Sequence, residues 1–89
     1  MIVRIAGEGQ YRLADAALAR INQLDDELER DLDTERFEAS LAALLDEVRT
    51  LGQPLADEEL LTSDVVLPPA GASADEVKAM LADDGLIPG

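Results

Sequence analysis

The chain has 89 residues, and its 20 acidic residues outweigh 7 basic ones to give a formal charge of −13. An electrostatic field of that sign repels phosphate backbones and anionic lipid headgroups, which argues against direct binding to nucleic acid or to bare membrane. The sequence contains no cysteine, so disulfides and thiol chemistry are excluded. It also contains no histidine, the usual neutral-pH base and the commonest zinc ligand.

Chain length and apolar composition indicate the fold class. A chain of this size forms one domain with a small core, and with only Tyr11 and Phe37 as aromatic residues that core must be largely aliphatic. The apolar run at the N-terminus is too short for a signal peptide, and no stretch approaches the ~20 apolar residues of a membrane span. We therefore predict one cytoplasmic α+β domain over residues 1–89.

Residues 2–13 have the pattern of a β-hairpin, with β-branched residues before a glycine-containing turn. The sequence predicts a three-residue loop of Gly7, Glu8 and Gly9, with Gly9 in the left-handed position. The pairs expected to face the core together are Val3 with Leu13 and Ile5 with Tyr11. This register sets Arg4 directly across from Arg12 on the outer face, where like charges are unfavourable unless a carboxylate or another anion lies between them.

Residues 14–32 and 34–51 predict two antiparallel helices joined by a short turn. Asp33 or Thr34 can cap the second helix, and Gly52 can end it. Apolar residues at steps of three and four predict the seam between the helices. They are Ala17, Ile21, Leu24 and Leu28 in the first helix and Phe37, Leu41, Leu44, Val48 and Leu51 in the second. Off this seam lie Leu45 and, further along, Leu60 and Leu61, which we expect to leave apolar surface for a partner.

The last third of the chain contains an acidic linker at 53–63, an apolar segment at 64–67 and a helix at 74–83. The apolar segment precedes Pro68 and Pro69, so it suits either a third, edge strand of the hairpin or an extended loop. Ser73 and Glu76 form a capping box for the last helix. The apolar stripe expected on that helix is Val77, Met80 and Leu81, with Gly85 ending it and Leu86 and Ile87 folding back.

Candidate chemistry is sparse. The serines lack a base that could activate them, and Gly7-Glu8-Gly9 lacks the third glycine of a phosphate-binding loop. The carboxylates between Asp25 and Asp33 suggest a cation site, but this segment lacks the glycine that a calcium loop requires, which favours a solvated helix face. We predict no enzyme activity and no catalytic, cofactor-binding or metal-binding residues.

Three sets of residues resemble motifs of the PspAA domain family, small proteins associated with phage shock protein A. They are Met1-Ile2-Val3-Arg4-Ile5 with Gly7-Glu8-Gly9-Gln10-Tyr11; Pro54-Leu55-Ala56-Asp57-Glu58-Glu59-Leu60 with Ser63-Asp64 and Leu67-Pro68-Pro69; and Asp84-Gly85-Leu86-Ile87-Pro88-Gly89. The resemblance implies a partner of the PspA type, a long coiled-coil protein that coats stressed membranes from the cytoplasmic side. It implies no catalytic residues.

These observations predict an interaction domain that acts as an adaptor or modulator of a PspA-type protein in the membrane-stress response, with only indirect membrane contact. The candidate partner-binding residues are Arg4 and Arg12 on the hairpin and Asp25, Asp26 and Glu29 on the first helix. Open sheet edges also predict a homodimer. The alternatives are a small dimeric acidic regulator of an unrelated partner and an acidic metal-responsive binder.

Overall fold

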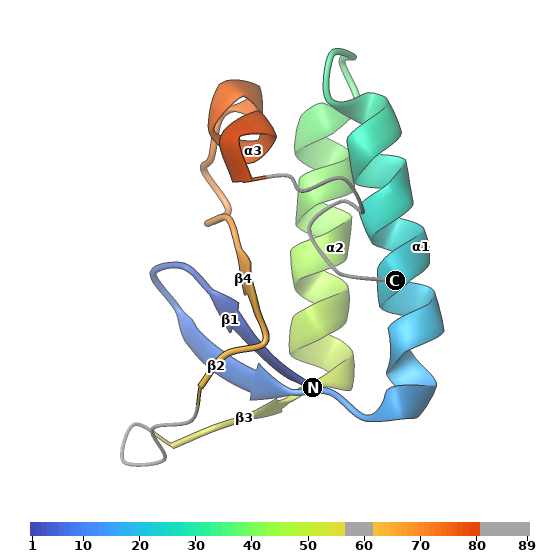
Figure 1. Cartoon of the computed structure of the whole chain (residues 1–89). Helices are drawn as coiled ribbons and strands as arrows, with labels where there is room; N and C mark the ends of the chain where they lie inside the picture. The colour runs from blue at the N-terminus through green and yellow to red at the C-terminus, as the bar shows by residue number, and fades with distance from the viewer. Residues whose placement is uncertain (57–61, 81–89) are drawn as a thin grey trace.

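The computed structural model of the chain describes residues 1–56 and 62–80. The elements are β1 (Ile2–Ile5), β2 (Gly9–Arg12), α1 (Asp15–Asp31), α2 (Phe37–Leu51), β3 (Gln53–Pro54), β4 (Val65–Leu67) and α3 (Ala74–Met80). Figure 1 shows α1 and α2 side by side next to the sheet. The predicted α+β class is confirmed, with an N-terminal hairpin, a helical hairpin and a short C-terminal helix.

The strands form one four-stranded mixed sheet in the order β3-β2-β1-β4. β2 pairs antiparallel with both β1 and β3, whereas β4 pairs parallel with β1. The apolar segment before the prolines is therefore a true edge strand. The opposite edge strand, β3, was not expected, since the sequence predicts only a linker there. β3 and β4 follow one another in the chain but lie at opposite edges of the sheet, with the β1–β2 hairpin at its centre.

The predicted hairpin register was wrong by two residues. The structure pairs Val3 with Tyr11 and Ile5 with Gly9, which makes Ala6, Gly7 and Glu8 the loop. The backbone N–H of Glu8 donates to the carbonyl of Ile5 at 2.9 Å, and Gly7, at the third position of this turn, has a φ of +81°. A type II turn requires a positive φ at that position, so the turn forms around Gly7 and shifts the pairing.

The core lies between the inner face of the sheet and the helices. Successive side chains of β1 and β4 point alternately to the two faces of the sheet. The side chains on the inner face, Val3 and Ile5 of β1 and Val65 and Leu67 of β4, are all buried. These strand residues belong to one apolar cluster with the helical seam. Its buried helical members are Ile21, Leu24, Leu28, Phe37, Leu41, Leu44, Leu45, Val48 and Val77.

Most of the predicted helical seam is confirmed, but one of its residues differs. Ala17 is partly buried, whereas Leu51 is 40% exposed. Leu45, expected to face outward, is fully buried. The reason is that α2 packs against both α1 and the sheet. Because α2 contacts two elements, its buried face is wide enough to include the adjacent positions 44 and 45.

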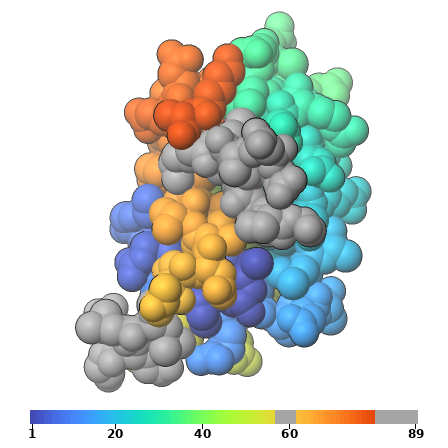
Figure 2. Space-filling view, viewed as in Figure 1, coloured from blue at the N-terminus to red at the C-terminus, as the bar shows by residue number. Residues whose placement is uncertain are grey.

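Capping was predicted correctly at Gly52, which ends α2, and at the start of α3, but not at the start of α2, where Arg36 rather than Asp33 or Thr34 is the N-cap residue and no side chain caps the helix. The helix predicted for residues 34–51 begins only at Phe37. The residues before it belong to the turn that joins α1 to α2, in which the Thr34 hydroxyl accepts the N–H of Arg36 at 3.1 Å. For α3, the N–H of Glu76 donates to Ser73 Oγ at 3.2 Å, as the capping box predicts. Figure 2 shows α3 beside the α1–α2 turn, where Lys78 pairs with Asp33. The predictions for Leu60, Leu61, Leu81, Gly85, Leu86 and Ile87 lie outside the described residues.

Candidate interaction surfaces

The outer face of the sheet carries two arginines. Because Val3 and Ile5 point into the core, Ile2 and Arg4 point the other way. Arg4 pairs in register with Gln10 of β2 and with Val66 of β4, and Arg12 pairs with Ile2. Arg4 and Arg12 thus share one face as diagonal neighbours, which corrects the prediction that they lie directly opposite each other.

The surface formed by Ile2, Arg4, Arg12 and Val66 is here termed the outer sheet face. Both arginines are exposed and Ile2 is partly buried. The side chain of Val66 is 46% exposed, compared with 5% for its neighbour Val65. Diagonal cross-strand neighbours lie roughly 7–8 Å apart, so the two guanidinium groups tolerate each other without an anion directly between them. The result is an amphipathic surface with two cations and an exposed aliphatic side chain.

Three of the other basic side chains have carboxylate partners, whereas Arg30 and Arg36 form no ion pair with a described residue. Arg49 pairs with Glu8 and with Asp46, Lys78 pairs with Asp33, and Arg20 approaches Glu47 at 3.8 Å. In the described ranges 1–56 and 62–80, no carboxylate forms an ion pair with either Arg4 or Arg12. Asp64, beside this face, instead accepts the backbone N–H of Ile2 at 2.8 Å. The two arginines are therefore not neutralised by described residues of their own acidic chain.

Gln10 shows how this face is bounded. Although it lies in register with exposed Arg4, it is only 8% exposed. Its side-chain Nε2 donates to Ser63 Oγ at 2.8 Å, and its backbone carbonyl accepts the N–H of Leu55 at 3.0 Å. Both ends of the connection between β3 and β4 therefore contact β2 at Gln10. Nothing in the local sequence identifies this contact, because the partners are 53 residues apart.

The second candidate surface is on α1, where Asp26 and Glu29 are exposed. Asp25 does not belong to it, since Asp25 is only 2% exposed. It occupies the position after Leu24 and one turn from Ile21 and Leu28, within the stripe that faces the core. Asp25 was therefore wrongly predicted as a surface residue for a partner. Within residues 1–56 and 62–80, no three carboxylates gather in a way that could hold a metal ion.

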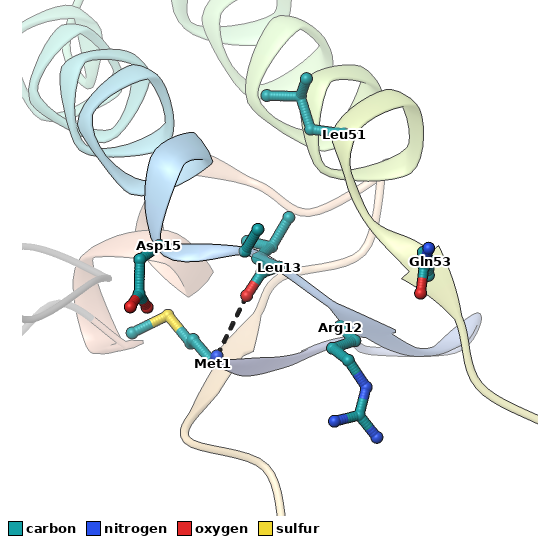
Figure 3. Close-up of a pocket in the computed structure, with 7 residues that line it drawn as sticks. Met1, Arg12, Leu13, Asp15, Leu51 and Gln53 are labelled. Carbon is teal, nitrogen blue, oxygen red and sulfur yellow. Dashed lines mark hydrogen bonds between the residues drawn. The ribbon is translucent and has the colours of Figure 1, made fainter.

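A shallow hollow lies where β2, the start of α1 and the end of α2 meet (Figure 3). Its lining residues are Met1, Arg12, Leu13, Ala14, Asp15, Leu51 and Gln53. The N-terminal amine of Met1 donates to the carbonyl of Leu13 at 3.1 Å. Figure 3 shows the Arg12 side chain pointing away from the helices. The lining contains no nucleophilic hydroxyl and no base next to one, so it offers no arrangement for nucleophilic catalysis.

A charged network joins the hairpin loop to α2. Arg49 donates through both Nε and Nη2 to the carboxylate of Glu8, and through Nη1 to Asp46 Oδ1 at 2.7 Å. The Tyr11 hydroxyl donates to the same Glu8 carboxylate at 3.4 Å. The hydrogen bonds from Arg49 hold the pKa of Glu8 below its ordinary value, and those to Glu8 raise the pKa of Arg49. This network fixes the loop but leaves the outer sheet face unaffected.

With the fold and these surfaces described, the chain can be compared with known proteins. A family model described as PspA-Associated protein matches residues 1–89. The chain belongs to the PspAA family. Neither a curated protein nor a solved structure gives a significant match. In the part of this PspAA chain that the structure describes, no helix combines the length and apolar character needed to cross a bilayer.

The candidate residues of this PspAA protein lie on two separate elements, the hairpin and α1. The fold brings Arg4 and Arg12 together on the outer sheet face, and it places Asp26 and Glu29 on the exposed side of α1. Sequence reasoning missed Val66, which is next to Arg4 in the sheet. The signal that could have found it is alternation: once the strand at 65–67 buries its first and third residues, its middle residue must point outward.

Proposed function

We propose that this PspAA protein is a non-enzymatic interaction domain that binds a PspA-type coiled-coil protein and acts as its adaptor or modulator in the membrane-stress response. The observation that carries this proposal is the family match over all 89 residues, because the family is described by its association with PspA. The chain's small size and its compact core are consistent with a module whose activity resides in its surface.

Electrostatics support an indirect route to the membrane. A formal charge of −13 on a domain of 89 residues opposes contact with anionic lipid headgroups. The same charge favours encounter with basic stretches of a protein partner and speeds association at low salt. The partner would then bring the domain to the cytoplasmic face of the membrane.

The non-enzymatic part of the proposal rests on the chemistry of the side chains. The sequence supplies no histidine or cysteine as base or nucleophile. The hollow at Met1, Arg12 and Asp15 holds no nucleophile paired with a base. A role in binding requires none of these groups.

The direct test is reconstitution with the PspA-type protein encoded in the same genome. We expect the two purified proteins to elute as one complex in size-exclusion chromatography with light scattering. The domain alone should not sediment with anionic vesicles, and it should sediment when the PspA-type protein is added. Failure to form a complex at micromolar concentrations would contradict the proposal. The mass of the domain alone, from the same light scattering, tests the predicted homodimer.

A further inference from the structure

We infer that the outer sheet face (Ile2, Arg4, Arg12 and Val66) is the docking surface for an acidic helical segment of the PspA-type partner, one that carries two carboxylates a helical turn apart. This inference rests on the proposed function and names the surface and chemistry through which that function operates.

The two arginines can reach a pair of carboxylates one turn apart on a helix, because the long Arg side chains can converge from their wider starting separation. Arg4 and Arg12 are diagonal neighbours on β1 and β2, so their stems start roughly 7–8 Å apart. Side chains three or four residues apart on a helix have Cβ atoms about 5–6 Å apart and point the same way. Each planar guanidinium can bind one carboxylate through two parallel hydrogen bonds. Two such pairs would fix both the position and the orientation of the helix.

Charge complementarity selects an acidic segment. Arg30 and Arg36 also form no ion pair within the described ranges, but they line a shallow hollow together with the carboxylates of Glu27 and Asp31. On the outer sheet face no described carboxylate pairs with Arg4 or Arg12. A carboxylate arriving from a partner therefore gains two cations without displacing an existing described ion pair.

The same electrostatics argue against a second copy of this chain as the occupant. Two molecules that each carry a formal charge of −13 repel one another over several ångströms. A coiled-coil partner with a local acidic stretch and basic residues elsewhere avoids that repulsion. Such a partner can be attracted to the acidic domain as a whole and still present carboxylates to this one face.

Apolar contacts complete the surface. Val66 is paired in register with Arg4. In the described ranges two large hydrophobic side chains are exposed, and Val66, at 46%, is more exposed than Leu51, at 40%. Ile2, paired with Arg12, is partly buried. Both flank the arginines, so an amphipathic helix could place its carboxylates on the guanidinium groups and an apolar side chain on Val66.

The experiment compares two double charge reversals in binding to the PspA-type protein. Arg4→Glu with Arg12→Glu alters the outer sheet face. Arg30→Glu with Arg36→Glu makes the same change in net charge on α1 and the turn after it, where both residues are exposed. We expect the first variant to lose at least about tenfold in affinity and the control to lose less than about threefold. Circular dichroism and thermal melting establish that each variant is folded.

A neutral pair keeps the test decisive if the first variant does not fold. Arg4→Gln with Arg12→Gln removes the charges without introducing repulsion and should still weaken binding by about fivefold or more. Peptides that tile the partner locate the bound segment. The segment should contain Asp or Glu residues three or four positions apart, and changing them to Lys should restore binding of the Arg4→Glu, Arg12→Glu protein.

The outcomes separate this inference from the proposed function. If wild type binds and the outer-face variant binds equally well, or if both charge reversals weaken binding equally, the docking surface is wrong while the proposed function stands. Mapping of the bound segment to a basic peptide also overturns the inference. If wild type forms no complex with the PspA-type protein, the proposed function fails and this inference fails with it.

Discussion

The two faces of the sheet differ sharply over very short stretches of chain. In β4, Val65 is 5% exposed and the next residue, Val66, is 46% exposed. In β1, Val3 is fully buried whereas Arg4 is exposed and lacks an ion pair among the described residues. Strand alternation thus assigns neighbouring residues to different tasks. One set holds the sheet against the helices, and the other can vary or bind a partner without affecting the core.

A similar contrast exists along α2. Leu44 and Leu45 are fully buried, whereas Leu51, the last residue of the helix, is 40% exposed. All three are leucines on one helix, so their contributions to stability should differ through burial alone. Substitutions at these leucines therefore test which residues of α2 belong to the core and which to the surface.

The largest expected effect is therefore at Leu44. Leu44→Ala should lower the free energy of unfolding by about 2–5 kcal/mol, because it removes buried methyl groups and leaves a cavity. Leu51→Ala should cost less than about 1 kcal/mol, because that side chain is already partly hydrated. Urea unfolding of both variants measures the difference. Equal losses would mean that the seam of the helical hairpin has been wrongly placed.

The second test compares the adjacent valines of β4. Val65→Ala should cost about 1–3 kcal/mol of unfolding free energy, because the side chain is buried beside Val3. Val66→Ala should change stability by less than about 0.5 kcal/mol. Thermal unfolding of the two variants, alike in composition, provides the comparison. A loss at Val66 as large as that at Val65 would show that the outer sheet face is covered within the chain.

Features that depend on interactions between residues close together in the sequence were predicted better than features that depend on contacts between distant residues. The helices depend on local periodicity and turn residues, and they were predicted close to their observed bounds, whereas the segment at 64–67 was left open between an edge strand and a loop. The hairpin register depended on which residues form the loop: the turn closes between Ile5 and Glu8 around Gly7, whereas a loop of Gly7, Glu8 and Gly9 was predicted. The burial of Leu45 depends on the packing of α2 against both α1 and the sheet, whereas that of Asp25 follows from its place in the apolar stripe of α1, which its charge masks in the sequence.

The candidate site shows the same limit. Alternation along β1 and β2 correctly placed Arg4 and Arg12 on the outer face, because a two-residue error in register keeps every side chain on its own face. It did not place them diagonally, since that depends on the register between β1 and β2, or bring Val66 beside Arg4, since that depends on the pairing of β1 with β4. The contact of Gln10 with Ser63 likewise arises only when the chain passes from one sheet edge to the other.

The smallest expected effect lies at the hairpin loop, away from both faces of the sheet. Hydrogen bonds from Arg49 hold the pKa of Glu8 below its ordinary value of 4.5, so the stabilisation they give is present above that pH and is lost as pH falls through the lowered pKa. Both side chains are about one third exposed, so Glu8→Gln should cost less than about 1 kcal/mol at neutral pH. The difference from wild type should shrink below pH 4.5 in urea unfolding. Arg49→Gln should remove the same pH-dependent part, and adding Glu8→Gln to it should remove no more; a difference that stays constant with pH would show that the pair contributes through packing rather than charge.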